Sequence, residues 1–370
     1  MIALSLARSA SGGPLHDIHG INVPQRVHLF EETYRGARLG ISYPPHNLIE
    51  KCLDEDLLEK VRAGGDPART ALILAAGNQI WMHESSRFPR RDPLLDYKLK
   101  LPYVAMTQIF AGRLASRFGA TGHVSTDGSA CASSLKCLMD VINLIENHDF
   151  ERVVVVAVDD AVSNEQLNIF GEAGASITIE EEEKGRLPSA FDARNGGFRL
   201  AQGAAVAVFE RESDRLEAPL ARLLGAFSAS EDADNPLGQR ADGSGFTRAI
   251  GGTLRQAKLQ PRDVAIVKTH GTGTDLNNRS ERAGLEAADL RDFVATSFKP
   301  AIGHTMGASG LLETILLFEH MRKGEVPAIA NRTERDETFL SQPCPVPPGT
   351  VLALAAGMGR IFSAAAFRPL

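Results

Sequence analysis

The sequence predicts an α/β fold, because short apolar runs alternate with longer stretches whose apolar residues recur at helical spacing. The chain has 370 residues, of which 43% are hydrophobic, so it is long enough to bury a large core. Its 34 glycines and 19 prolines would interrupt the chain often and keep the elements short. Length alone allows one large domain or two or three smaller ones.

In the first half we expect three strands, at TALILAAG (70–77), HVST (123–126) and RVVVVAV (152–158). The third is a run of β-branched residues, which is typical of a strand buried on both faces. Helical spacing and a terminal glycine predict a helix over 103–119. A second helix starts near Cys131, so this cysteine is expected at a strand-to-helix junction.

The second half repeats this alternation. We expect strands over 204–210 and 220–227, followed by a helix over 245–259. Segment 263–275 is expected to be a strand that runs into a Gly/Thr-rich loop, and 291–324 to be a strand, a loop and a helix closed by glycine. The pattern indicates a coarse doubling of a β-α-β unit.

Three segments are expected to lie outside these elements. The charge run EEEEKGR (180–186) is expected to be a solvated loop. The Pro-rich SQPCPVPPGT (341–350) is expected to be a rigid connector before the last strands. The N-terminal MIALSLARSASGG contains an apolar run that is too short for a secretion signal.

Composition argues against several classes of protein. The formal net charge is −6, whereas a general nucleic-acid binder usually presents a basic face. Four cysteines are too few for a disulfide scaffold, and scattered histidines without a C-x-x-C pair do not indicate a metal site. No segment approaches the ~18 uncharged apolar residues of a membrane span. We therefore expect a soluble, cytoplasmic protein.

Cys131 lies in DGSACASSLKCL (127–138), where small residues surround it and a helical pattern begins directly after it. The first turn of a helix offers unpaired N–H groups and the positive end of the helix dipole, and both favour a thiolate. The same N–H groups can hold the oxyanion that forms when sulfur attacks an acyl carbonyl. Cys131 is therefore a candidate nucleophile. The alternative is a buried inert thiol, which is the commoner fate of a cysteine in an α/β core.

Two histidines lie in glycine-rich loops of the second half. His270 opens HGTGT directly after a predicted strand, at the rim where α/β proteins bind ligands. His304 lies in KPAIGHTMGASGLLE, five residues after Lys299 and ahead of Glu313 on the following helix. Taken singly, each has a structural alternative: His270 would cap a turn, His304 would be incidental to a helix entry, and Lys299 would be solvated.

Together these segments resemble the β-ketoacyl synthases of the elongating type, which have the thiolase fold. The motifs that carry the resemblance follow one another as the Cys131 turn, SAFDARNGGFRLAQGAAVAVFE (189–210), THGTGTDLNNRSE (269–281) and KPAIGHTMGASGLLE (299–313). The joint set is specific although the single motifs are not, and it runs from about residue 70 to the C-terminus. It differs from that of the initiating synthases, whose triad pairs cysteine with histidine and asparagine.

The resemblance implies two pseudo-duplicated βαβ halves that form a core of α-β-α-β-α layers. The expected halves are residues 1–210, with Cys131, and residues 211–370, with His270, Lys299 and His304. The family is usually dimeric, with central strands that pair across a two-fold axis, and its chemistry needs no metal or redox cofactor.

By resemblance, Cys131 accepts an acyl chain from an acyl carrier protein or a coenzyme A thioester. His270 and His304 then promote decarboxylation of a malonyl thioester, a task that suits neutral imidazoles, and the carbanion attacks acyl-Cys131 in a Claisen condensation. Lys299 matches the family lysine that tunes the field near the second histidine. Glu313 matches the family glutamate on the following helix.

The chain departs from the family's pattern in four places. The segment before TALILAAG is shorter than usual. Asn277 and Asn278 replace the usual Gly-Asp ahead of Glu281, which is kept. Gln202 replaces a glutamate. Because the asparagine and glutamine changes remove negative charges, we expect different hydrogen-bond partners at these positions.

The fourth departure concerns the family's Gly-Phe-Gly-Gly-Thr-Asn loop, whose phenylalanine gates the pocket and whose backbone helps to form the oxyanion hole. The matching stretch is AAGMGRIFSAAAF (355–367), which places Gly357, Met358 and Gly359 in the gate loop and Arg360 at a usual glycine. A flexible methionine would admit an unusual acyl chain. Arg360 would either meet a carboxylate or phosphate or point into solvent, and we favour solvent.

We therefore expect a discrete β-ketoacyl synthase of a specialised fatty-acid or polyketide pathway, which acts as a homodimer or with a second ketosynthase-like subunit. One alternative is a chain-length-factor-like partner subunit, although such subunits usually lose the cysteine. Another is an acyltransferase that passes acyl-Cys131 to an oxygen or nitrogen nucleophile. Arg90, Arg91 and Lys98 are candidates for docking an acidic carrier protein, but solvated surface charges explain them equally well. Neither a nucleic acid nor a membrane is an expected partner.

Overall fold

Ten strands form the large sheet, five from each half of the chain. The computed structural model describes residues 1–11, 15–18, 22–28, 49, 52–77, 107–160, 162, 164–214, 217–232 and 238–370. The strands from the first half are β1 (Ile2–Ser11), β4 (Thr70–Ala75), β5 (His123–Asp127), β6 (Arg152–Asp160) and β7 (Gln202–Arg211). Those from the second half are β8 (Ala221–Ser230), β9 (Val264–Lys268), β10 (Val294–Thr296), β13 (Thr350–Gly357) and β14 (Ile361–Pro369).

The two halves of this sheet have the same topology. The strand order is β10-β9-β13-β14-β8-β1-β7-β6-β4-β5, so from either edge inward the third, second, fourth, fifth and first strands of a half follow one another. The second strand of each half is parallel to the third and fourth, and the fifth is antiparallel to the fourth and first. β1 and β8 join the halves through three residue pairs. The predicted pseudo-duplication of the fold is therefore confirmed.

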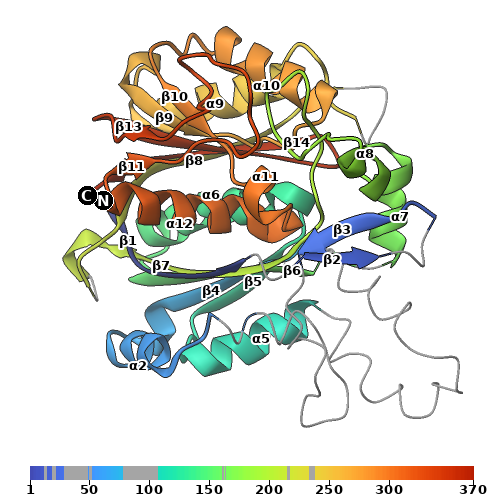
Figure 1. Ribbon diagram of the computed structural model, residues 1–370. Coiled ribbons are helices and arrows are strands. Elements are labelled where there is room, and N and C mark those ends of the chain that lie inside the picture. Colours follow the sequence, from blue (N-terminus) through green and yellow to red (C-terminus); the bar gives the residue numbers. More distant parts are fainter. Residues whose placement is uncertain are drawn as a thin grey trace, which may run out of the picture.

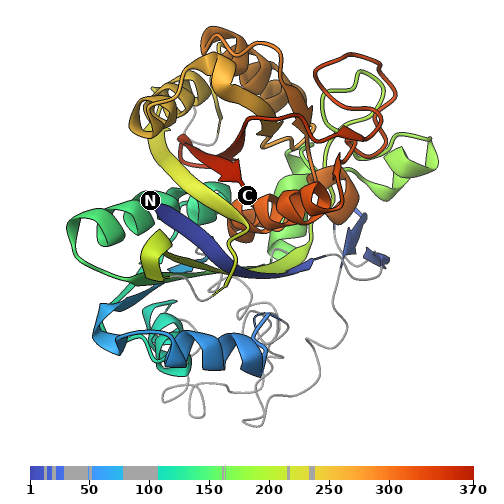
Figure 2. The same ribbon diagram turned by 90° about the vertical axis from the view of Figure 1, so that its left-hand side faces the viewer.

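The helices lie in three layers, and the sheet passes between them twice (Figure 1). One outer layer contains α9 (Ser244–Ala257) and α10 (Asp275–Ala287), and the other contains α2 (Glu55–Ala63) and α5 (Thr107–Phe118). The middle layer contains α6 (Ser133–Asn147) and α12 (Ser309–Arg322). Figure 2 shows the same layers from the side, with the two chain termini close together. The predicted α-β-α-β-α core is confirmed.

The middle layer explains the composition of its helices. α12 is buried along most of its length, from Ser309 to Phe318, because a sheet layer covers it on either side. The helices of this layer pack closely at their N-terminal ends, where a Cβ at Gly310 would lie 2.7 Å from Cγ of Leu135. Only glycine at position 310 permits this approach. Glu313 lies in the same buried part of α12 and therefore needs charged partners.

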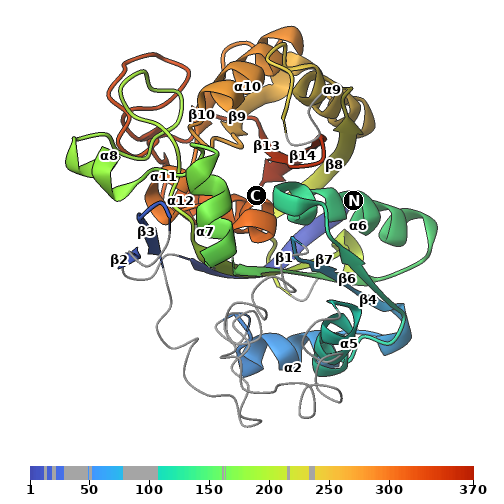
Figure 3. The same ribbon diagram turned by 90° about the vertical axis from the view of Figure 1, so that its right-hand side faces the viewer.

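Several smaller elements lie outside these layers. They are β2 (Leu15–Ile18) and β3 (Gln25–His28), the helices α7 (Asn164–Glu172), α8 (Ile179–Glu183) and α11 (Lys299–Ile302), and the pair β11 (Glu325–Val326) and β12 (Cys344–Pro345). Figure 3 shows α7 and α8 beside β2 and β3, on the side away from the termini. No helix in the described ranges is long and apolar enough to span a membrane.

Two segments differ from what the sequence predicts. Residues 2–11 form β1, a central strand that pairs with β7 and β8, although the sequence pattern did not indicate it. The charge run 180–186, expected to be a solvated loop, starts inside helix α8, which Thr178 caps through a capping box with Glu181. Glu182 is buried there because Arg199 binds it through two nitrogens at 2.9 and 2.7 Å. The boundary between domains near residue 210 stays a prediction.

Candidate active site

Cys131 lies on a sharp turn between a strand and a helix, as the sequence predicts. β5 ends at Asp127, a 3-10 turn, η3 (Ala130–Ala132), follows, and α6 begins at Ser133. Ala130 has a φ of 48°, in the left-handed region that few side chains adopt. Cys131 is only 5% exposed, and its Sγ lies 3.9 Å from Sδ of Met306.

One cavity of about 190 Å³ brings the three predicted side chains together. Cys131, His270 and His304 all line it, although they come from distant segments of the chain. Aromatic and apolar side chains form much of the wall, among them Phe170, Phe198, Leu276, Met358 and Phe362. Polar side chains line the remainder, namely Gln239, Thr272, Thr274 and Asn277. A nucleophilic sulfur and two imidazoles thus face one partly apolar space.

The neighbours of His304 fix the position of its proton. The N–H of Met306 lies 3.3 Å from Nδ1 of His304, and because an N–H only donates, Nδ1 must accept. Oγ of Ser309 lies 2.9 Å from the same nitrogen. A neutral ring therefore carries its proton on Nε2. Phe198 packs edge-on against this ring, with centroids 5.1 Å apart, and holds its orientation.

The backbone of His270 is held from both sides. Its N–H donates to Oε1 of Glu281 at 2.5 Å, and the next N–H, of Gly271, donates to Oε2 at 3.0 Å. Its carbonyl accepts a hydrogen bond from Nζ of Lys299 at 2.6 Å. The ring lies 5.8 Å from that of His304, centroid to centroid, and nearly perpendicular to it. Its Nδ1 is buried without a hydrogen-bond partner in the described part of the chain.

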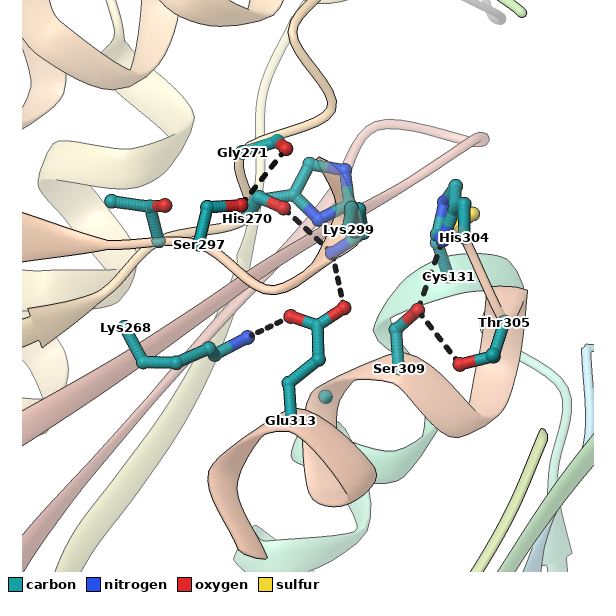
Figure 4. A network of polar contacts seen from close by, with 12 residues as sticks. Cys131, Lys268, His270, Gly271, Ser297, Lys299, His304, Thr305, Ser309 and Glu313 are labelled. Atoms are coloured by element: carbon teal, nitrogen blue, oxygen red, sulfur yellow. Dashed lines mark hydrogen bonds and ion pairs between the residues drawn. The ribbon is translucent and has the colours of Figure 1, made fainter. Parts of the chain in front are cut away.

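A buried carboxylate between two lysines lies behind the histidines (Figure 4). Oε1 of Glu313 accepts from Lys299 at 2.8 Å, and Oε2 accepts from Lys268 at 3.1 Å. All three side chains are almost completely buried. The lysine and glutamate predicted from the sequence are thus in contact. Lys299 also bonds to the backbone of His270, and its charge acts on His304 as expected.

Both imidazoles are neutral in this environment. Burial lowers the pKa of His270 and of His304 well below the usual value, and the ammonium of Lys299 lowers both further. Lys268 adds to the effect at each ring. The structure therefore agrees with the expectation that both histidines are uncharged.

The sequence led us to expect a thiolate at Cys131, but the fold favours the thiol. Burial raises the pKa of the Cys131 thiol to about 12, Lys299 opposes this rise, and Asp159 adds to it. The expectation considered only the start of helix α6, whereas desolvation by the whole fold outweighs that local field. Burial therefore favours the thiol form of Cys131.

The gate loop meets the nucleophile turn through its backbone. Gly357 and Met358 line the cavity, whereas Gly359 is exposed and does not. A Cβ on Gly357 would lie 2.6 Å from the carbonyl oxygen of Ser129, so this close approach requires glycine. Arg360 is partly exposed and lies 3.7 Å from the Asp232 carboxylate, in keeping with an outward direction.

The three residues that replace the family's usual glycine, aspartate and glutamate form hydrogen bonds within this fold. Nδ2 of Asn277 donates to Oε2 of Glu281 at 3.1 Å, so it orients the carboxylate that holds the His270 backbone. Oδ1 of Asn278 accepts from the N–H of Phe191 at 3.2 Å. Nε2 of Gln202 donates to Oδ1 of Asp160 at 2.9 Å, where a glutamate would have faced a second carboxylate.

Three residues that contact the predicted site residues were not predicted from the sequence. Lys268 precedes His270 by two residues, and its signal was a charged residue at the end of an otherwise apolar buried strand. Ser309 and Phe198 both contact His304, but nothing in the sequence singles them out. Arg90, Arg91 and Lys98, the candidates for carrier docking, lie outside the described residues. Within those residues, no group of three or more His, Cys, Asp or Glu side chains could hold a metal ion.

Solved ketosynthases share this fold over the whole chain. One match is a chain of the complex between the ketosynthase ApeO and its chain length factor ApeC from Xenorhabdus doucetiae, at 18% sequence identity and a TM-score of 0.78. That match covers 100% of this chain and 98% of the other. A second is an AntDE:AntF structure, described as a type II PKS acyl-carrier protein in complex with its ketosynthase, with the same identity and TM-score over 100% and 99% of the two chains. At this identity the likeness establishes the fold, and the predicted thiolase-like class is confirmed.

Sequence relatives give a closer match over part of the chain. A protein of Streptomyces cyaneus described as a putative polyketide β-ketoacyl synthase 1 is 31% identical over 228 residues, which are 60% of this chain and 53% of the relative. The chain spans about half to two thirds of the length of the first curated relatives that it matches.

Two family models match consecutive parts of the sequence. The N-terminal domain of β-ketoacyl synthases matches residues 51–215, and the C-terminal domain matches residues 220–333. Together they cover about three quarters of the chain and include Cys131, His270, Lys299 and His304. The chain belongs to the β-ketoacyl synthase family.

Proposed function

We propose that this protein is a condensing β-ketoacyl synthase, which joins an acyl group carried on Cys131 to a two-carbon unit from a malonyl thioester. The observation that carries the proposal is the single cavity lined by Cys131, His270 and His304. A sulfur nucleophile beside two neutral imidazoles fits acyl transfer followed by chemistry on an enolate. Family membership supports the same reaction.

The first step is acyl transfer to Cys131. The sulfur attacks the carbonyl carbon of an acyl thioester, the bond to the carrier sulfur breaks, and the carrier leaves with the proton that Cys131 gives up. Backbone N–H groups of the Cys131 turn and of Gly357 and Met358 would hold the tetrahedral oxyanion. Because the resting thiol has a pKa of about 12, binding of the thioester must assist loss of the proton.

The second step is decarboxylation and condensation. His270 and His304 donate hydrogen bonds to the thioester carbonyl of the malonyl group, and the protonated Nε2 of His304 suits this role. The C–C bond to the carboxylate breaks, CO₂ leaves, and the electron pair moves onto the enolate. The enolate carbon attacks the carbonyl of acyl-Cys131, the C–S bond breaks, and a 3-ketoacyl thioester is released. The electron pair of the broken bond stays on the sulfur of Cys131, which takes up a proton from solvent and returns to the thiol.

The remaining predicted residues would act through the histidines. Lys299 and Glu281 fix the His270 backbone through its carbonyl and its N–H. Glu313 in turn orients Lys299. These groups touch the backbone or each other, so we propose supporting roles for them and reserve direct contact with substrate for Cys131, His270 and His304.

The partners follow from the same chemistry. We propose that an acyl carrier protein or coenzyme A delivers both thioesters, and that the protein acts as a dimer with a second copy or a related subunit. Of the two solved complexes described above, that of ApeO contains a chain length factor and that of AntDE contains an acyl carrier protein. Relatives described as polyketide synthases support a role in specialised polyketide or fatty-acid biosynthesis.

Intact-mass measurement after incubation with a panel of acyl thioesters tests the first step. We expect the protein to gain the mass of one acyl group, and Cys131→Ala to gain none. Addition of a malonyl thioester should then release the label as a product two carbons longer, with loss of CO₂. Absence of an acyl adduct on the wild type, alone and with candidate partner subunits, would contradict the proposal.

Product mass also separates the alternatives. Release of the acyl group onto an oxygen or nitrogen nucleophile, without carbons from malonate, would indicate an acyltransferase. Condensation only by an added partner subunit, with Cys131 unlabelled, would indicate a chain-length-factor-like role. Retention of the cysteine in the same cavity as both histidines favours the condensing enzyme.

A further inference from the structure

Lys268 is a charged residue in the interior of the molecule. It is the last residue of β9 and is 0% exposed. Ile266, two residues earlier and on the same face of the strand, packs in the core cluster that contains α12. A lysine in such a place is costly unless its charge is paired and its donors are satisfied, so its contacts show what it is retained for.

The ammonium of Lys268 connects three walls of the cavity. Nζ donates to Oε2 of Glu313 on α12 at 3.1 Å and to the carbonyl of Leu354 on β13 at 2.9 Å. β13 continues from Leu354 into Gly357, which lines the cavity. α12 follows the loop that carries His304, and β9 leads directly into His270. The Lys268 side chain therefore links β9, its own strand, to α12 and to β13.

Lys268 also restricts the orientation of the Glu313 carboxylate. Lys299 takes one carboxylate oxygen of Glu313 and Lys268 takes the other, so Glu313 cannot turn away from Lys299. Lys299 then presents its remaining donor capacity to the carbonyl of His270. The path from Lys268 to His270 consists of hydrogen bonds between buried groups, as Figure 4 shows.

We propose that Lys268 is a positioning residue of the condensation reaction, which fixes the Glu313–Lys299 pair beneath His270 and ties β13 to it. The inference rests on the proposed function for its effect on turnover. Its effect on the histidines themselves does not depend on that function.

The charges around the histidines predict the direction in which their pKa values change when Lys268 is replaced. Facing them are the ammonium groups of Lys268 and Lys299, the carboxylate of Glu313 and, at the His270 backbone, that of Glu281. The neutral thiol of Cys131 lines the same cavity, and the Asp159 carboxyl group accepts a hydrogen bond from the N–H of Gly307, three residues after His304. Loss of Lys268 removes one positive charge from this set. Protonation of both imidazoles then becomes easier, and they charge at a higher pH than in the wild type.

The test is Lys268→Met, which keeps the length of the side chain and removes its charge and donors. We expect kcat for condensation to fall about 10- to 100-fold, as for other residues that orient a catalytic group, while acyl-Cys131 still forms. We expect the acid limb of the pH profile of malonyl thioester decarboxylation to move to higher pH by about one pH unit. Titration of ¹³Cε1-labelled histidines by NMR should show the same movement for His270 and His304.

Two controls separate positioning from a general loss of stability. Lys60→Met removes an equal charge from the exposed ion pair on α2 and should leave kcat and the acid limb unchanged. The double variant Lys268→Met/Glu313→Gln restores the local net charge, so its acid limb should return toward that of the wild type while kcat stays low.

If Lys268→Met does not fold, Lys268→Gln replaces it, because glutamine keeps a hydrogen-bond donor group and removes the charge. We expect the acid limb of Lys268→Gln to move to higher pH, as for Lys268→Met. Wild-type kcat together with an unmoved acid limb in a folded Lys268 variant would overturn the inference. If the wild type forms no acyl-Cys131, the proposed function fails. The histidine titration then still decides the inference: an unmoved imidazole pKa overturns it, and a raised one supports it.

Discussion

The close approach between the gate loop and the nucleophile turn leads to a quantitative prediction for Gly357→Ala. A Cβ at this position would lie 2.6 Å from the carbonyl oxygen of Ser129 and 3.2 Å from the backbone nitrogen of Ala132. Ordinary van der Waals contacts begin at 3.4 Å. The two backbones must therefore separate by about 0.8 Å, because neither contact atom belongs to a flexible side chain.

This displacement acts directly on Cys131, which lies between the two residues that the new methyl group would meet. A misplacement of about 1 Å at a reacting group costs on the order of 100-fold in rate. We therefore expect Gly357→Ala to acylate Cys131 about 10- to 100-fold more slowly than the wild type. Overpacking of this kind also costs about 1–3 kcal/mol of unfolding free energy.

The assay is the rate at which Cys131 gains acyl mass, measured on protein whose folding has been checked by thermal unfolding. Gly112→Ala is the matched control, since no heavy atom lies within 4 Å of a Cβ at that position in α5. It should acylate at the wild-type rate and gain up to about 1 kcal/mol of stability. A folded Gly357→Ala protein that acylates as fast as Gly112→Ala would refute the steric reasoning.

Three further predictions follow from buried titratable and charged groups. Burial raises the pKa of Cys131 to about 12, so alkylation by iodoacetamide should accelerate about tenfold per pH unit from pH 7 to 10, and a plateau near pH 8 would contradict this. Burial also raises the pKa of Asp159 from 3.8 to about 7, so the stability that it contributes is present below pH 3.8 and lost as pH rises to 7. Urea unfolding should therefore show wild type losing up to about 4 kcal/mol relative to Asp159→Asn over that range, and a difference independent of pH would disprove the sign. Arg152→Met should cost about 3–5 kcal/mol in urea unfolding because it leaves Glu210 buried without this ion pair, whereas acylation by the folded protein should not change.

Local patterns predicted the elements that depend on local physics. β6 is buried at all nine positions, and its β-branched run indicated that burial. Strand β1 was not predicted, because its partners β7 and β8 lie some two hundred residues away in the sequence and because its own sequence becomes polar after Leu6. Helix α8 was missed for a different reason. Its capping box was visible in the sequence, but four consecutive glutamates indicated solvent exposure, and Arg199, which pairs with Glu182, lies outside this run, 17 residues later.

At the site, too, local sequence predicted some features, whereas others depend on distant segments. Motifs identified Cys131, His270 and His304, and the fold places them around one cavity. The ionisation of Cys131 could not be predicted from its neighbours in the chain, because desolvation depends on every segment that covers the sulfur. Lys268 was missed for the same reason. The apolar strand before it was a local signal, but its role depends on Glu313, which is 45 residues away in the sequence.

The repeated topology explains why these groups meet at all. In each half the third strand is followed by a middle-layer helix that begins with a 3-10 turn, at Ala130–Ala132 before α6 and at Met306–Ala308 before α12. The first residue of each turn has a positive φ, 48° and 45° respectively. One half places Cys131 within its turn, and the other places His304 just before its own.

The two helix N-termini are also in direct contact, because the N–H of Leu311 donates to Oγ of Ser134 at 3.1 Å. Two positive helix ends therefore converge beside one cavity. Their field opposes protonation of the imidazoles and favours any negative charge that forms near the sulfur, whether thiolate, oxyanion or enolate. Burial opposes this field at the sulfur and keeps Cys131 a thiol, whereas burial and the field act in the same direction on the two histidines and keep both neutral.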